Sequence, residues 1–225
     1  MCKTGGQEMT GLYDLHTHTL LSDGEMLPIE LVRRMSVIGY TIVAITDHVD
    51  ATNTRSVVEN LHLLRASASH FGVQLLCGVE ITHVPPVEIP ALAELAKNSG
   101  ADIVLVHGET LVEPVAPGTN HAACACQLVD VLAHPGLILA SDVKLAAENG
   151  LALELTARGG HNRANGHVAK LAKEYGCTLV VDSDAHAPHD ILDERARISI
   201  ARGAGLDEQE SRQVTSLNIK QWLSR

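Results

Sequence analysis

Aromatic side chains are scarce in this sequence: phenylalanine, tryptophan and tyrosine make up 2% of its 225 residues. The core must therefore be built from alanine, valine, leucine and isoleucine, because hydrophobic residues still make up 45%. No run of about 18 apolar residues occurs, which argues against a membrane-spanning helix. Basic residues are also few, and the formal net charge of −10 at pH 7 argues against a broad basic surface for nucleic acid.

Cysteine is limited to five residues, an odd number without a second closely spaced pair. Cys124 and Cys126 lack the partners of a tetrahedral metal site, so we expect them to be small buried side chains. Residues 1–10 are polar and lack the apolar stretch of a secretion signal, and we expect them to be a short tail. Reduced thiols and a cytoplasmic location follow as expectations.

Short apolar runs alternate with helix-like segments along the whole chain. Most of the runs are continuous rather than alternating, which is typical of parallel strands buried on both faces. The strands are expected at Gly11–His16, Thr41–Thr46, Val73–Val79, Asp102–Val106, Leu128–Ala133, Leu151–Leu155 and Thr178–Val181. The helices are expected near 28–38, 53–71, 89–99, 141–149, 162–175, 188–203 and 207–223. This order predicts one α/β domain over residues 11–225, a barrel of seven strands rather than an open sheet.

The first strand ends in the motif Asp14-Leu15-His16-Thr17-His18. Side chains of a strand alternate between its two faces, so His16 and His18 point to the same side. Two imidazoles with a nearby carboxylate are suited to one divalent metal ion. The motif alone is equally compatible with ordinary surface or core histidines, and repetition along the chain decides between the readings.

Every later strand also ends in a side chain that can bind a metal. Because the strand ends of a parallel barrel meet at one rim, these residues should converge there. Singly, His107 or His134 could be a core histidine and Glu80 an ion-pair partner. Together they would crowd one dry rim with charge, which two or three divalent cations would balance. The candidate ligands are His16, His18, Asp23, His48, Glu80, His107, His134, Asp184 and His186.

Mixed imidazole and carboxylate ligands favour Zn, Mn or Fe over Mg. Four further acids at the same strand ends suit a supporting role, in which a carboxylate orients a ligand histidine. These acids are Asp14, Asp47, Glu154 and Asp182. The stretch 108–120 contains two prolines and two glycines and is expected to be a loop over the site.

Six motifs in a fixed order resemble the polymerase-and-histidinol-phosphatase (PHP) superfamily: DLHTHTLLSDG, ITDH, GVE, VHGE, AHPG and SDAH. The resemblance covers residues 12–190 and implies a distorted (βα)7 barrel, similar to a TIM barrel, with a trinuclear metal site at the C-terminal rim. It implies that His16, His18, Glu80 and Asp184 hold one ion. Glu80 would bridge to a second ion at His107 and His134, and Asp23, His48 and His186 would hold the third. Some members carry a histidine at the place of Asp23.

Clustered divalent ions predict a hydrolase, in which an activated water attacks a phosphoryl group. Arg158 is the first candidate for binding phosphate, because a guanidinium pairs with its oxygens and the adjacent glycines allow close approach. His161 and Arg163 are weaker candidates for the same role. The candidate catalytic groups are Glu80, Asp184 and His186, with the leaving-group acid left open between the last two and a metal-bound water.

A phosphatase acting on a small phosphorylated substrate, of histidinol-phosphatase type, is the leading hypothesis. The compact barrel and the acidic composition favour it. A nuclease or nucleotide phosphoesterase acting on nucleotides or oligonucleotides through the same site is the alternative. A non-catalytic scaffold, such as a ribonuclease P protein component, is disfavoured by the complete ligand set.

Overall fold

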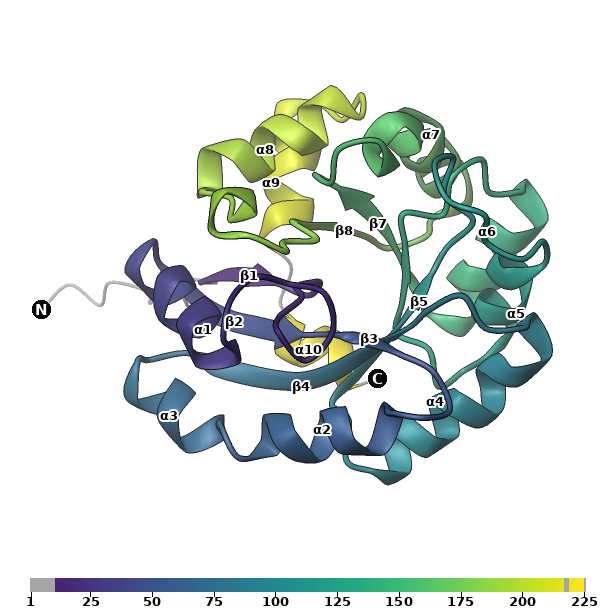
Figure 1. Cartoon of the computed structure of the whole chain (residues 1–225). Coiled ribbons are helices and arrows are strands. Elements are labelled where there is room, and N and C mark those ends of the chain that lie inside the picture. Colours follow the sequence, from purple (N-terminus) through teal and green to yellow (C-terminus); the bar gives the residue numbers. More distant parts are fainter. Residues whose placement is uncertain (1–10, 217–218, 225) are drawn as a thin grey trace, which may run out of the picture.

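A parallel sheet curves around the centre of the molecule and is covered on its outer side by helices (Figure 1). The computed structural model describes residues 11–216 and 219–224, so the expected tail at 1–10 lies outside the described residues. The sheet order is β1-β2-β4-β5-β6-β7-β8, and the short β3 pairs with β4. The strands are β1 (Leu12–Asp14), β2 (Tyr40–Ile45), β3 (His48–Val49), β4 (Gln74–Ile81), β5 (Ile103–His107), β6 (Val131–Ala133), β7 (Ala152–Thr156) and β8 (Leu179–Asp182).

The sheet nearly closes into a barrel, as the sequence predicts. The segments that follow β1 and β8 meet in a parallel bridge between Thr17 and Ala185. Two backbone hydrogen bonds extend this contact, from His18 N–H to Ala185 O at 2.8 Å and from Asp184 N–H to His16 O at 3.0 Å. The prediction of a distorted (βα)7 barrel is therefore confirmed, with the seam between the first and last strands.

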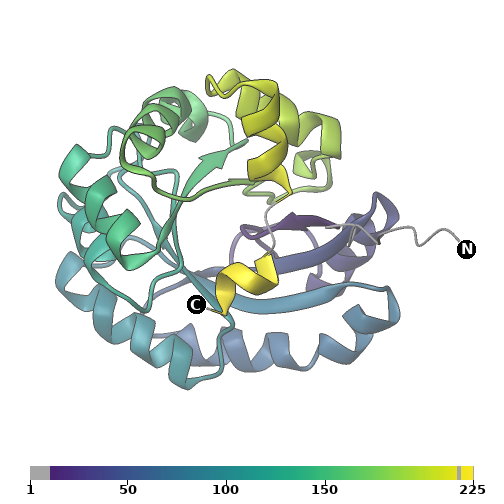
Figure 2. The same cartoon turned by 180° about the vertical axis from the view of Figure 1, so that it is seen from behind.

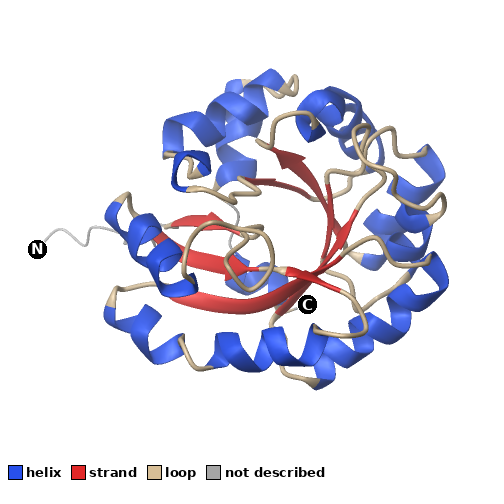
Figure 3. Cartoon of the chain, in the orientation of Figure 1, coloured by secondary structure: helices blue, strands red, loops and turns tan. Residues whose placement is uncertain are grey.

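Helices alternate with the strands and, apart from α10 at the end of the described chain, form the outer layer (Figure 3). They are α1 (Pro28–Val37), α2 (Thr54–His62), α3 (Arg65–His70), α4 (Ile89–Asn98), α5 (Thr119–Ala125), α6 (Ala140–Asn149), α7 (Asn165–Tyr175), α8 (Glu194–Gly203), α9 (Glu208–Thr215) and α10 (Ile219–Leu223). Three 3-10 turns complete the set: η1 (Pro86–Glu88), η2 (His161–Ala164) and η3 (Pro188–Asp190). Each helix among residues 11–216 and 219–224 is too short or too polar to cross a bilayer.

Several helix predictions are wrong at their boundaries. The helix expected over 53–71 is broken at Leu63 and Leu64, whose N–H groups donate to the carbonyls three residues earlier. The helix expected over 188–203 begins only at Glu194, where the Asp193 side chain accepts the N–H of Ala196. The helix expected over 207–223 ends at Thr215 and is followed by the separate α10. The hydrophobic periodicity of a sequence does not reveal such breaks, because local hydrogen bonds decide where a helix ends.

The core has two parts, one inside the barrel and one between the sheet and the helices. The interior is filled by strand residues such as Tyr13, Leu76 and Leu105, and Ile219 and Trp222 of α10 pack against them. Figure 2 shows α10 lying across the opening of the sheet at the end of the chain. Cys124 and Cys126 are buried in the outer layer, as expected from the sequence.

Arg197 of α8 is a fully buried cation beside the barrel seam. Its Nη2 donates to Val181 O at 2.8 Å, and its Nη1 donates to Thr215 O at 3.2 Å. Its guanidinium carbon lies 4.2 Å from the centre of the Tyr13 ring. The guanidinium also counteracts the rise in pKa that burial causes in the carboxyl groups of Asp14 and Asp182, so one side chain connects α8, α9, β1 and β8.

Replacing Arg197 by methionine should lower the free energy of unfolding by about 3 to 5 kcal/mol, since it leaves buried carboxylates and carbonyls without their partner. The measurement is urea unfolding followed by circular dichroism. Arg195 lies on the same helix and is exposed, so the Arg195→Met variant should change stability by less than about 0.5 kcal/mol. Equal losses in the two variants would contradict the structural role of Arg197.

Candidate metal centre

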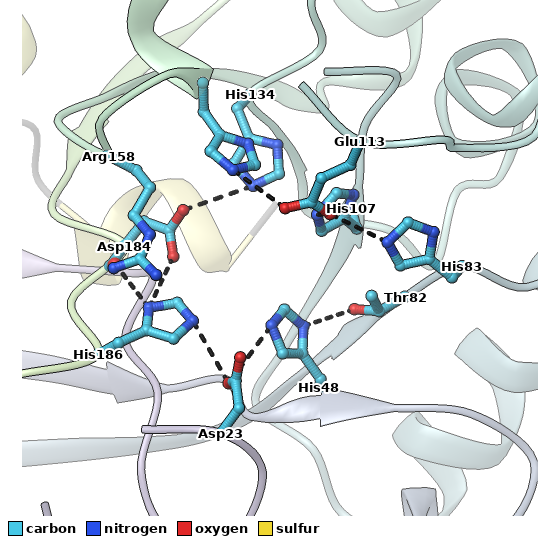
Figure 4. A pocket seen from close by; sticks show the side chains of 11 residues that line it. Asp23, His48, Thr82, His83, His107, Glu113, His134, Arg158, Asp184 and His186 are labelled. Atoms are coloured by element: carbon cyan, nitrogen blue, oxygen red, sulfur yellow. Dashed lines mark hydrogen bonds and ion pairs between the residues drawn. The ribbon is translucent and has the colours of Figure 1, made fainter. Parts of the chain in front are cut away.

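All nine sequence-predicted ligands lie together at the carboxyl ends of the strands. His16, His18 and Asp23 follow β1, and Asp184 and His186 follow β8, while the others end or follow the strands between. They surround and underlie a cavity of about 290 Å³ (Figure 4). Its lining residues are Asp23, His48, Thr82, His83, His107, Glu113, His134, Arg158, His161, Asp184 and His186.

A first group at the bottom of the cavity joins two histidines and two acids, all of them buried. His16 Nε2 lies 3.4 Å from Glu80 Oε2 and 3.7 Å from Asp184 Oδ1. His18 Nε2 lies 3.5 Å and 3.4 Å from the same two oxygen atoms. The four donor atoms therefore face one another around a common point.

A second group lies next to the first, around His134. Its Nε2 atom is 3.6 Å from Glu80 Oε1 and 3.6 Å from Asp184 Oδ2. His107, His134 and His161 also have ring nitrogens close enough to share one ion. Glu80 and Asp184 thus each direct one oxygen toward His16 and His18 and the other toward His134.

A third group forms on the opposite side of the cavity, where the loop after β1 returns to the seam. Asp23 Oδ1 is 3.6 Å from His48 Nε2 and 3.3 Å from His186 Nε2. His48 lies on β3, where it is paired in register with Glu80 of β4. Asp23 therefore belongs to a different group from His16, although the two are close in sequence.

The donor atoms of these groups fit divalent cations better than direct hydrogen bonds. Ligand atoms that share one ion at about 2.1 Å lie roughly 3 to 3.7 Å apart, as these do. His16 Nε2, both ring nitrogens of His18 and Glu80 Oε1 are buried without a hydrogen-bond partner among the described residues. Buried polar atoms are normally paired, so this cluster of unpaired atoms indicates a place for cations.

Glu154 of β7 holds two of the ligands in place. Its Oε1 is 2.8 Å from His16 Nδ1, and its Oε2 accepts the backbone N–H of His134 at 2.8 Å. Such a contact fixes the orientation of the ring and leaves Nε2 free for an ion. Asp47 holds the loop after β1 in place in a comparable way, since it accepts hydrogen bonds from Thr19 and Ser22.

The histidines of the site differ in the direction in which their surroundings shift the pKa. Burial lowers the pKa of His18 to about 4, and burial and the neighbouring His107 hold the pKa of His134 well below its usual range. Both rings are therefore neutral at pH 7, as a metal ligand must be. Burial opposes a charge on His16, but the carboxylates of Glu154 and Glu80 raise its pKa, so an ion there would have to displace a proton.

The three residues predicted to bind phosphate do not lie together. Arg158 and His161 line the cavity, and Arg158 Nη1 is 3.4 Å from Asp190 Oδ2. Asp190 also accepts the N–H groups of His186 and Ala187, so it links Arg158 to the loop after β8. Arg163 is exposed and is not among the residues that line the cavity.

Three residues that line the cavity are not predicted from the sequence: Thr82, His83 and Glu113. Thr82 Oγ1 lies 2.7 Å from His48 Nδ1, and Glu113 Oε2 lies 3.0 Å from His83 Nε2. Glu113 belongs to the stretch 108–120, whose position over the site is confirmed. Its proline and glycine content indicated a loop, but no local pattern indicates which side chain turns inward.

Several proteins are similar in sequence to this chain over most of its length. An uncharacterized protein of Methanocaldococcus jannaschii is 43% identical over 88% of this chain and 92% of its own length. A probable phosphatase of Shewanella pealeana is 32% identical over 82% of this chain and 81% of its own. Ribonuclease P protein component 3 of Methanosarcina mazei is 27% identical, covering 88% of this chain and 83% of its own.

Solved structures share the fold at low identity. A chain of an archaeal ribonuclease P with mature tRNA has a TM-score of 0.71 at 16% identity, covering 94% of this chain and 90% of its own. Histidinol phosphate phosphatase from Lactococcus lactis has a TM-score of 0.62 at 15% identity, covering 89% and 93%. The profile of the PHP domain matches residues 14–176. The chain therefore belongs to the PHP domain family.

Proposed function

We propose that this protein is a metal-dependent phosphoesterase that hydrolyses a small phosphomonoester. The observation that carries the proposal is the placement of Glu80 and Asp184, each with one oxygen toward His16 and His18 and the other toward His134. Two carboxylates shared in this way suit two adjacent cations, an arrangement used to hydrolyse phosphate esters. The 32% identical probable phosphatase of Shewanella supports the same class of reaction.

Two or three divalent ions of Zn, Mn or Fe fit the donor set. His16, His18, Glu80 and Asp184 would hold the first ion. Glu80, His107 and His134 would hold the second, and Asp23, His48 and His186 would hold the third. Bound ions of this kind lower the pKa of water and neutralise the charge that develops on a phosphoryl group.

The side chains around the ions would bind the substrate and move protons. Arg158 lies in the cavity wall with its guanidinium held near Asp190, where it can pair with phosphate oxygens. Asp184 and His186 both line the cavity and are the candidates for the group that protonates the leaving oxygen. His161 extends the same wall, whereas the exposed Arg163 is the weakest candidate.

A nuclease or nucleotide phosphoesterase remains the second candidate function, and it would use the same ions. The similarity to ribonuclease P protein component 3 is the observation that favours an RNA partner, whether as a substrate or in a scaffold. The acidic composition and the complete ligand set favour a small substrate and catalysis. Buried cysteines such as Cys124 fit a reducing, cytoplasmic location.

Glu80→Gln and His134→Ala should each lower phosphate release from phosphomonoesters by more than about a hundredfold, because losing a residue that only orients a ligand already costs 10- to 100-fold. The assay is a screen with Zn, Mn or Fe of histidinol phosphate, 3′- and 5′-nucleotides and single-stranded oligonucleotides. Chelation of the wild type should abolish the same activity. The exposed Glu94→Gln is the control and should keep full activity.

The screen also separates the candidate functions. Release of phosphate from small esters alone supports the phosphatase, and cleavage of oligonucleotides alone supports the nuclease. A wild type that binds metal and hydrolyses none of these compounds would contradict the proposed enzyme and favour a scaffold. Full activity in Glu80→Gln or His134→Ala would show that the centre built on Glu80 and Asp184 takes no part in the reaction.

Arg158→Ala should raise KM for phosphomonoesters by about 10- to 100-fold, since a charge-assisted hydrogen bond contributes about 1.5 to 3 kcal/mol. Its metal content should equal that of the wild type, because Arg158 supplies no ligand atom. Arg163→Ala is the matched comparison, an exposed arginine of the same segment, and should change KM little. An unchanged KM in Arg158→Ala would exclude this residue from substrate binding.

A further inference from the structure

Backbone strain marks the residues of the cavity. Three non-glycine residues in the described part of the chain have positive φ angles: His83 at 54°, His134 at 27° and Asp184 at 52°. All three line the cavity. Such conformations cost about 1 to 3 kcal/mol each and concentrate at functional sites. Two of the three are predicted ligands, whereas His83 has no part in the nine-residue set.

Glu113 brings His83 into contact with that set. Its Oε2 lies 3.0 Å from His83 Nε2 and 3.1 Å from His107 Nε2, and its Oε1 lies 3.2 Å from His161 Nε2 (Figure 4). One carboxylate thus faces three imidazoles, from the loop after β4, the end of β5 and the turn η2. His83, His107 and Glu113 each offer a ligand atom within reach of one common ion.

The loop that carries Glu113 is held over the cavity by its own contacts. Glu109 Oε1 accepts the N–H groups of Gly118 at 2.9 Å and Asn120 at 3.0 Å, which ties the two ends of the loop together. Val112 packs against Gly160: a Cβ atom added to Gly160 would lie 3.3 Å from Cγ1 of Val112. Glu113 therefore points into the cavity because the loop is fixed on both sides of it.

The atoms that face Glu113 lie closer together than the atoms of the other groups. Their separations of 3.0 to 3.2 Å fall where the range for two ligands of one ion meets the range for a hydrogen bond. The orienting contact between Glu154 and His16 is shorter, at 2.8 Å. His107 Nδ1 and His161 Nδ1 are buried without a hydrogen-bond partner among the described residues, so the two rings are held mainly through the atoms that face Glu113.

We propose that His83 and Glu113 are further ligands of the ion held by His107, with His161 beside them, so that the loop 108–120 delivers a ligand of its own. This inference rests on the metal centre of the proposed function and adds residues outside the nine that the sequence motifs supply. The ligand chemistry, imidazole with carboxylate, is that of a divalent transition cation such as zinc. Metal binding should then order this loop.

The test measures zinc, not activity. Purified wild type, Glu113→Gln and His83→Gly are titrated with zinc against a competing chelator, and bound zinc is counted by mass spectrometry. Glycine at position 83 accepts the positive φ angle, so the variant removes the ring without adding strain. We expect both variants to bind one zinc ion at least about tenfold more weakly, with the other ions retained.

Hydrogen exchange of the loop 108–120 is the second measurement. Zinc should slow the exchange in the wild type at least about tenfold more than in Glu113→Gln. Glu109→Gln is the matched control, because it removes the same charge from the same loop while glutamine keeps an Oε1 acceptor for the N–H groups of Gly118 and Asn120. It should keep the zinc affinity and the protection of the wild type.

The outcomes separate this inference from the proposed function. His18→Ala should lose zinc whether or not Glu113 is a ligand. Loss of zinc in His18→Ala with wild-type zinc binding in Glu113→Gln and His83→Gly overturns the inference alone. Equal weakening in Glu109→Gln and Glu113→Gln overturns it as well, because charge and not ligation would then be the cause. A wild type that binds no zinc, manganese or iron overturns the metal centre itself.

Discussion

The carboxylate of Glu154 is the constraint on which the centre depends. It is fully buried, and its two oxygens hold His16 Nδ1 and the N–H of His134 at 2.8 Å each. The two contacts reach from β7 to the ends of β1 and β6, so they fix the distance across the barrel. A buried carboxylate is tolerated only with such partners. Its position also leaves the Nε2 atoms of both histidines facing Glu80 and Asp184.

A second group of buried ionisable side chains lies near the seam of the barrel. Asp14 and Asp182 are fully buried there, and burial raises the pKa of both carboxyl groups. Arg197 of α8 lies beside them and counteracts this rise. Arg197 and the predicted ligand Asp184 both lie beyond residues 14–176, the part matched by the family profile. The centre is therefore complete only when the C-terminal segment returns to β1.

Much of the fold follows from the sequence for a simple physical reason. Strands buried on both faces appear as continuous apolar runs, and each of the seven expected runs overlaps a strand of the sheet, whereas the two-residue β3 was not expected. The helices were less predictable, as the break at Leu63 and the unexpected α5 (Thr119–Ala125) show. Their ends depend on hydrogen bonds and on contacts with other segments, which hydrophobic periodicity does not encode.

The sequence by itself determined which strand ends carry metal-binding side chains, since alternation along a strand and parallel order place His16, Glu80 and Asp184 at one rim. The resemblance of the motifs already implied that Asp23 belongs with His186 rather than with His16, and the tertiary structure added the distances between these groups. It also decided that Glu113 turns into the cavity, because the direction of a loop side chain depends on segments distant in sequence. Strand-end positions are local properties of the chain, whereas loop positions are set by packing.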